Sequence, residues 1–117
     1  MLDYDHTAPT AKHLLETHEP FFCAVREKNK ELPVIIMSRP WANISDKEDT
    51  MKRRDIIKRT YENAISKGDK NVYFIDGMEL YEGIQRDLTS VDLCHPTDMG
   101  FYIMAQKVYT LIRDILE

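Results

Sequence analysis

An aspartate and a histidine lie three residues apart in the segment Asp92-Leu93-Cys94-His95-Pro96. At this spacing the aspartate can fold back across a loop and accept a hydrogen bond from imidazole Nδ1–H, which leaves Nε2 free to take a proton from an attacking hydroxyl. Pro96 disfavours the α region for His95, so an extended backbone presents the ring just before a helix begins. The pair therefore predicts an orienting acid and a general base, although such a pair outside this context is more often a turn and a cap.

The hydroxyl that this pair would serve is not evident among the serines. Ser45 is interpreted as a helix cap, Ser66 as a helix-end residue and Ser90 as a polar loop residue. Ser38 follows a predicted strand, but no tight glycine turn presents it as a nucleophile. We therefore expect the nucleophile to come from outside this chain.

Three predicted loops follow strands, and the carboxyl ends of parallel strands are where ligands gather in open sheets. The first holds Asp5 and His6, which are either residues around a site or a solvated strand end. The second holds Arg39 and Trp41, which either form the wall of a substrate pocket or cover the end of the sheet. The third carries the Asp92 and His95 pair.

Cysteine and metal chemistry are both disfavoured. Cys94 adjoins His95, but the side chains of adjacent residues usually point apart, which argues against a Cys–His nucleophile. A zinc site from His6, His95 and Cys94 is conceivable, but no short-range ligand pair marks it, and we expect neither a metal nor another cofactor. His13 and His18 lie in a charged helical stretch and are predicted to be surface residues.

The elements that must position these residues alternate between strands and helices. Residues 2–5 are predicted to be the end of a strand. Further strands are predicted at 33–37, from a continuous apolar run, and at 71–76, which is rich in β-branched and aromatic residues. Helices are predicted over 11–29, from the Ser45-Asp46-Lys47-Glu48 capping pattern to Gly68, and after Thr97. Because Pro20 is disfavoured inside a helix, the first of these is interpreted as two helices, with Thr17 capping the second.

This alternation predicts an α/β fold with a parallel sheet of about three strands, in a single domain over 1–117. A sheet of three strands is thin, and its first strand has an unpaired outer edge. We expect a neighbour there: an amino-terminal segment, a second copy of the chain in a homodimer, or another subunit.

Composition narrows the partners and the location. The formal charge of −4 comes from 16 basic and 20 acidic residues that are interspersed, so no basic stripe marks a nucleic-acid partner. No stretch approaches the length of an apolar membrane span, and the first residues do not have the pattern of a signal peptide. A cytoplasmic location is the default expectation, and secretion stays open if the protein is longer.

The residues that close the chain resemble a known family. The stretch from Val91 through Asp92, His95 and Pro96 to Gly100 and Ala105 is similar to the closing block of the GDSL/SGNH hydrolases, in the GDSL-like lipase/acylhydrolase branch. The segment Asp3-Tyr4-Asp5-His6-Thr7-Ala8-Pro9 resembles the third block of that family. The resemblance covers nearly the whole chain.

The resemblance implies a three-layer α/β/α flavodoxin-like fold and hydrolysis of carboxylic esters, often acyl groups on carbohydrates or lipids, without a metal. By carry-over, Asp92 and His95 are the acid and the base of the triad. The chain has no counterpart of the first block with its catalytic Ser or of the second block with its oxyanion-hole Gly. Thr7 stands where the family has an oxyanion-hole Asn, and it serves either that role or a turn hydrogen bond.

Two functions follow as hypotheses. In the first, the chain is the carboxy-terminal part of an acyl or acetyl esterase, inactive by itself, and its substrate is a small-molecule ester or an acylated carbohydrate. In the second, it is a non-catalytic binding or assembly module that dimerises through the open edge of its sheet.

Overall fold

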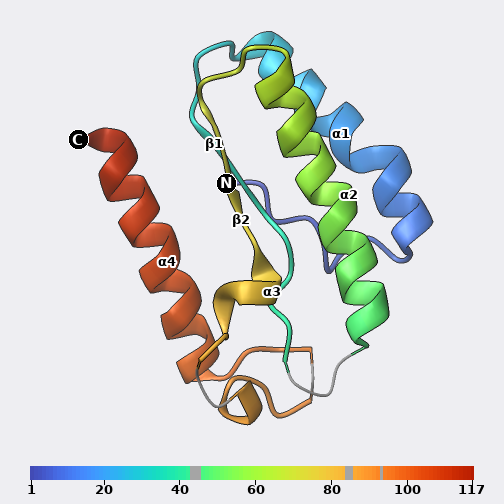
Figure 1. Cartoon of the computed structure of the whole chain (residues 1–117), viewed down its shortest axis with the longest axis vertical. Helices are drawn as coiled ribbons and strands as arrows, with labels where there is room; N and C mark the ends of the chain where they lie inside the picture. Colours follow the sequence, from blue (N-terminus) through green and yellow to red (C-terminus); the bar gives the residue numbers. More distant parts are fainter. Residues whose placement is uncertain (43–45, 84–85, 93) are drawn as a thin grey trace.

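A computed structural model describes residues 1–42, 46–83, 86–92 and 94–117. Its centre is a two-stranded parallel sheet of β1 (Val34–Met37) and β2 (Val72–Ile75). Helices α1 (Ala11–Lys28) and α2 (Lys47–Ser66) lie on one side of the sheet and α4 (Asp98–Leu116) on the other (Figure 1). The short helix α3 (Gly77–Leu80) and a 3₁₀ turn (Arg86–Leu88) lie between β2 and α4. The predicted α/β class with three layers is confirmed.

Strand β1 is buried along its whole length, as expected for a strand that is covered on both faces. Val34 and Ile36 point into the core under α1 and α2, which also contains Leu14 and Ile57. Ile35 and Met37 point to the opposite face and pack with residues of α4. The two-residue period of a strand therefore divides one apolar run between two cores.

The first predicted strand, at residues 2–5, is reduced to a single bridge, so the expectation of about three strands is too high for the described residues. Leu2 pairs in parallel with Ile36, through Leu2 N–H to the Ile35 carbonyl (2.7 Å) and Met37 N–H to the Leu2 carbonyl (3.1 Å). The chain then turns at residues 5–7 towards α1. One residue on this side of β1 is too little to form a strand.

The predicted break at Pro20 is wrong, because α1 is one continuous helix with Pro20 inside it. Its N-cap is Thr10, whose hydroxyl accepts a hydrogen bond from His13 N–H, whereas the Thr17 hydroxyl donates to the His13 carbonyl. Buried positions of α1 continue at a spacing of four through the proline: Leu14, His18, Phe22. Packing of this stripe offsets the hydrogen bond that Pro20 cannot donate.

Helix α2 begins and ends close to the predicted positions. Asp46 is its N-cap and accepts from Asp49 N–H, while Ser45, which was interpreted as the cap, lies outside the described residues. After the last turn, Gly68 takes a positive φ of 89°, a conformation that favours glycine and ends the helix as predicted. In the part of the chain that the structure describes, no helix is both long and apolar enough to cross a membrane.

Candidate active site

Two glycines bring the loop between β2 and α4 close to the rest of the molecule. A Cβ atom on Gly77 would lie 2.0 Å from the Arg39 carbonyl oxygen, so only glycine permits the chain after β2 to pass the chain after β1. A Cβ on Gly100 would lie 2.6 Å from the Thr89 carbonyl oxygen. The first turn of α4 is thereby packed directly against the loop that carries Asp92 and His95.

Further hydrogen bonds close this loop at the amino end of α4. Thr97 N–H donates to the Thr89 carbonyl (2.8 Å), and the Thr97 hydroxyl donates to the Leu88 carbonyl (2.6 Å). The same hydroxyl accepts from Gly100 N–H and caps α4, as predicted. The described residues between 89 and 97 therefore form a short lobe whose two ends are joined.

Within this lobe, the structure brings Asp92 and His95 into direct contact. His95 Nδ1 lies 2.6 Å from Asp92 Oδ2, and Asp92 Oδ1 accepts from the backbone N–H of His95 (2.7 Å) and of Cys94 (3.0 Å). The His95 side chain is 81% exposed, and no described residue makes a hydrogen bond to Nε2. With the proton on Nδ1, the ring presents Nε2 as a base towards solvent.

The contacts around Asp92 keep its carboxyl ionised. The hydrogen bond from the His95 side chain, followed by the backbone N–H groups of His95 and Cys94, lowers the pKa of Asp92 well below its usual range. An ionised acceptor beside Nδ1 favours the tautomer that leaves Nε2 unprotonated, and it stabilises the imidazolium once Nε2 has taken a proton. The arrangement is suited to general base catalysis.

The loop at residues 5–9 lies beside the Asp92 and His95 lobe. Cys94 Sγ is 3.9 Å from His6 Nδ1, which joins the two loops. Partial shielding from water, followed by the positive charge of Arg39, lowers the pKa of His6. Thr7 makes the turn hydrogen bond that was one of its two predicted roles, because its hydroxyl donates to the Tyr4 carbonyl (3.1 Å).

Asp5 and Arg39 are held within the framework that supports these loops. Asp5 is fully buried, accepts from Arg39 N–H (2.8 Å), and has Arg53 Nη1 at 3.6 Å from its Oδ1. The Arg39 guanidinium turns towards α2, where it donates to Thr50 (2.7 Å) and Asp49 (3.0 Å). Both residues therefore connect the end of β1 to α2.

Trp41 covers the end of the sheet, which is one of its two predicted roles. Its ring is buried, with the Lys47 ammonium 4.9 Å and the Arg86 guanidinium 4.5 Å from the centroid. The backbone N–H of Trp41 also donates to the Gly77 carbonyl (3.2 Å). Trp41 thus connects the chain after β1 to the start of α2, to the 3₁₀ turn and to α3.

The serines of this chain have other roles wherever the structure describes them. Ser38 is fully buried, and its Oγ accepts from Gly77 N–H (2.8 Å), so it is turned into the sheet. Ser66 is the last residue of α2. The Ser90 hydroxyl donates a long hydrogen bond of 3.4 Å to Asp92 Oδ1 and supports the pair.

The cavity beside the Asp92 and His95 pair is very small. It has a volume of about 10 Å³ and lies between the chain after β1 and the lobe, lined by Pro40, Ala42, Tyr81, Thr89, Ser90, Cys94 and Pro96. Over residues 1–42, 46–83, 86–92 and 94–117, no three His, Cys, Asp or Glu side chains are grouped so that they could hold a metal ion. Because the His95 side chain is 81% exposed and the adjoining cavity is this small, the pair lies at the surface rather than in a pocket.

Sequence reasoning missed one residue that orders the first loop. Arg53 is buried in α2, and its Nη1 donates to the carbonyls of Asp5 and Ala8, both at 2.9 Å. Its Nε also pairs with Asp49 one helical turn earlier (2.9 Å). The available signal was an arginine on the buried side of α2, four residues after an aspartate and four before Ile57.

The sequence profile of the GDSL-like lipase/acylhydrolase family matches residues 7–113. This chain belongs to that family. The resemblance noted in the closing block is therefore confirmed, and the chain has a fold of the hydrolase type that the family shares.

Solved structures with similar folds include two larger proteins. A crystal structure of a candidate GDSL-like lipase from Bacteroides ovatus matches with a TM-score of 0.76 and 27% identity, over 92% of this chain and 33% of that one. The salicylyl-acyltransferase SsfX3 from a tetracycline biosynthetic pathway matches in fold, with a TM-score of 0.66 and 19% identity, over 90% of this chain and 33% of that one. This GDSL-family chain thus spans about a third of the length of each. A search of curated protein sequences gives no significant match.

Proposed function

We propose that this chain supplies the acid and the base of a carboxylic-ester hydrolase, and that the attacking serine hydroxyl comes from a part of the protein outside residues 1–117. The observation that carries the proposal is the 2.6 Å contact between His95 Nδ1 and Asp92 Oδ2 on an imidazole that is otherwise exposed. Membership of the GDSL-like family and the buried position of Ser38 support the same assignment.

The proposed reaction has two stages, acylation of the serine and hydrolysis of the acyl-enzyme, and His95 takes up and returns one proton in each. His95 Nε2 takes the proton of the serine hydroxyl as its oxygen attacks the ester carbonyl, and the imidazolium then gives this proton to the leaving alkoxide. Water repeats the sequence on the acyl-enzyme and releases the carboxylic acid. Asp92 remains a carboxylate throughout and stabilises the imidazolium. Small-molecule esters and acylated carbohydrates are the proposed substrates.

The test compares two proteins with p-nitrophenyl acetate. The 1–117 chain by itself is expected to show no turnover above buffer, whereas a protein that continues through the nucleophile-bearing part of the fold is expected to turn over. In that longer protein, His95→Ala should remove nearly all activity, because no base remains to activate the serine. His13→Ala, at an exposed position on α1, is the matched control and should keep wild-type activity. Full activity in His95→Ala would refute the assignment.

An assembly module is the second candidate, and the single bridge at Leu2 is the observation that favours it. Beyond this bridge no described residue pairs with the outer edge of β1, which leaves that edge available to a further strand. Sedimentation of the 1–117 chain at micromolar concentration distinguishes the candidates. A stable dimer would support assembly through this edge, and a monomer that stays folded would count against it.

A further inference from the structure

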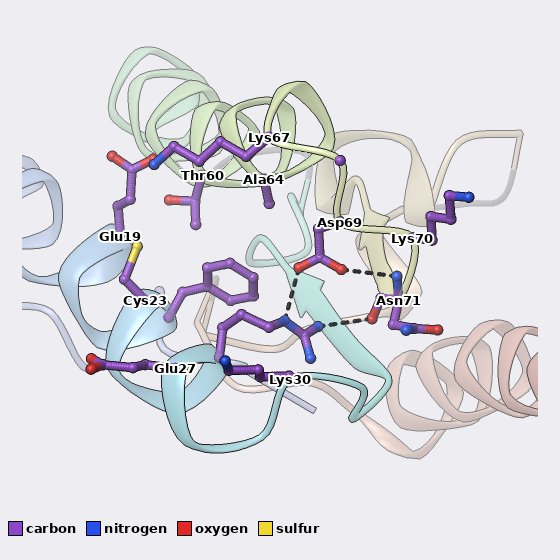
Figure 2. Close-up of a pocket in the computed structure, with 13 residues that line it drawn as sticks. Glu19, Cys23, Glu27, Lys30, Thr60, Ala64, Lys67, Asp69, Lys70 and Asn71 are labelled. Carbon is purple, nitrogen blue, oxygen red and sulfur yellow. Dashed lines mark hydrogen bonds and ion pairs between the residues drawn. The ribbon is translucent and has the colours of Figure 1, made fainter.

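A second cavity lies at the other end of the strands from Asp92 and His95. It has a volume of about 540 Å³ and opens between the second half of α1, the last turns of α2 and the segment that leads into β2. Figure 2 shows the side chains that surround it. Its volume falls within the range of small-molecule sites, and no step of the proposed hydrolysis uses it.

The floor of this cavity is apolar and well packed. Phe22 and Ala64 are only 4% and 6% exposed, and Thr60 between them is buried. The Thr60 hydroxyl is already bonded to His18 Nδ1 (2.8 Å), so it is not a free polar group that a ligand must satisfy. Cys23 lies in the wall and is exposed. Such a floor favours the apolar body of a ligand.

The rim of the cavity carries charged side chains, and only some of them have a hydrogen-bond or ion-pair partner. Arg26 is bound to Asp69 (2.8 Å), and Glu19 accepts from Asn63 (2.7 Å). Lys30 and Lys67, on opposite sides of the opening in Figure 2, have no ion-pair partner among the described residues, and the same holds for Lys70 and for the acidic Glu27. Four basic and three acidic side chains line the cavity, so the available charge is positive.

We propose that this cavity binds a small amphiphile with one carboxylate, its apolar chain on Phe22 and Ala64 and its carboxylate at Lys30 and Lys67. The unpaired ammonium groups give the head a charge complement, and the buried floor gives the chain a dry surface. The inference does not depend on the proposed hydrolase activity, because the site lies at the opposite end of the sheet.

The experiment uses decanoate below its micellar concentration as the probe and the alkylation of Cys23 by iodoacetamide as the readout, on the longest protein that contains this chain. Peptide mass spectrometry reports Cys23 and Cys94 separately, and Cys94 serves as the internal reference outside the cavity. At about ten times the Kd of decanoate, Cys23 alkylation should slow by about tenfold, because only about a tenth of the cavities are empty. Decyltrimethylammonium has the same tail with a cationic head and should protect far less.

Charge reversal provides the matched variants. Lys30→Glu with Lys67→Glu should weaken decanoate binding by about tenfold or more, since two repulsive charges replace two attractive ones. Lys52→Glu with Lys107→Glu makes the same change of net charge at exposed positions on α2 and α4 and should leave the Kd within about twofold. All four positions are exposed, so folding is preserved, as circular dichroism checks. Decanoate that leaves Cys23 unprotected, equal protection by the cation, or equal binding by both double variants would overturn the proposal.

Discussion

Asp92 uses both of its carboxylate oxygens to hold the loop that carries His95. Oδ1 accepts from two backbone N–H groups, and Oδ2 faces His95 Nδ1. The first set fixes the loop, and the second fixes the proton on the ring. A variant that keeps the first set and changes the second therefore separates the two roles.

Asp92→Asn is that variant in a hydrolytically active protein. The amide oxygen can still accept from the backbone, but an amide nitrogen opposite Nδ1 favours the tautomer with the proton on Nε2. We expect kcat for p-nitrophenyl acetate to fall by roughly 10⁴-fold with little change in KM. Asp98→Asn, in the exposed first turn of α4, is the control. A kcat within about tenfold of wild type would show that Asp92 does not orient the base.

His18 is buried in the core, which corrects its prediction as a surface residue. Its Nδ1 contacts Thr60 (2.8 Å), Nε2 has no partner among the described residues, and burial lowers its pKa to about 4. The charged neighbours Glu16 and Glu19 suggested an exposed face. The spacing of four between Leu14, His18 and Phe22 was the contrary signal.

The pKa of His18 predicts a loss of stability in mild acid. The folded pKa is lowered relative to the unfolded value of 6.5, so the unfolded chain takes up the proton first as the pH falls. The contribution, up to about 3 kcal/mol, is present above pH 6.5 and is lost progressively towards pH 4. Urea unfolding at several pH values should show a flatter dependence in His18→Gln, whereas His13→Gln should keep the wild-type slope. Identical slopes in all three proteins would contradict a buried neutral His18.

At the scale of elements, helix and strand positions followed from the sequence because periodic patterns are local. The run Val34 to Met37 and the pattern after Thr97 each predicted their element. The effect of Pro20 was misjudged. The hydrogen bond that Pro20 removes from the helix is offset by packing along the whole of α1, and a rule based on neighbouring residues takes no account of that packing. The close approach of the lobe to α4 also depends on contacts between distant segments. Gly100 was noted in the sequence only as part of the family pattern, without the close approach that it permits.

Gly100→Ala tests how closely the lobe must approach α4. The added Cβ would lie 2.6 Å from the Thr89 carbonyl oxygen and 2.9 Å from Pro96 Cβ, so the lobe has to move away from the helix. We expect a loss of about 1–3 kcal/mol in unfolding free energy, together with a fall in kcat in the active protein. Gly68→Ala, where the new Cβ meets open space but φ is +89°, should cost about 1 kcal/mol without affecting kcat. Equal effects on kcat would show that the approach at Gly100 does not position His95.

At the scale of the whole molecule, the two faces of the sheet are covered unequally. Helices α1 and α2 share one face, whereas α4 alone covers the other, as Figure 1 shows. The outer side of α4 carries exposed apolar and aromatic residues: Phe101, Tyr102, Tyr109, Ile112, Leu116. An apolar surface of this kind promotes association in water.

Tyr109→Lys with Ile112→Lys should therefore reduce self-association of the 1–117 chain. Two charges replace two exposed hydrophobic side chains, so the weight-average mass from light scattering should fall towards that of the monomer. Gln106→Lys with Thr110→Lys adds the same charge at polar positions on the same helix and should have a smaller effect. If both double variants have the same weight-average mass, any change from wild type comes from net charge and not from the apolar surface of α4.

How much of the site could be predicted depended on whether its geometry is local. Asp92 and His95 are three residues apart, and their contact follows from the loop that they share. The contact of Cys94 with His6 joins residues 88 positions apart, and the buried links from Asp5 to Arg39 and Arg53 join two other segments. Such pairs depend on the tertiary fold, so sequence patterns placed these residues at the right end of the sheet without their partners.

The Arg26 guanidinium joins three segments at the far end of the sheet. It donates to Asp69 Oδ2 and to the carbonyls of Asn29 (2.8 Å), Leu32 (2.6 Å) and Asn71 (3.1 Å). The end of α1 and the starts of both strands thus share one side chain. Amide hydrogen exchange in these segments is therefore expected to be correlated, with local opening as one cooperative unit rather than independent fraying of three chain ends.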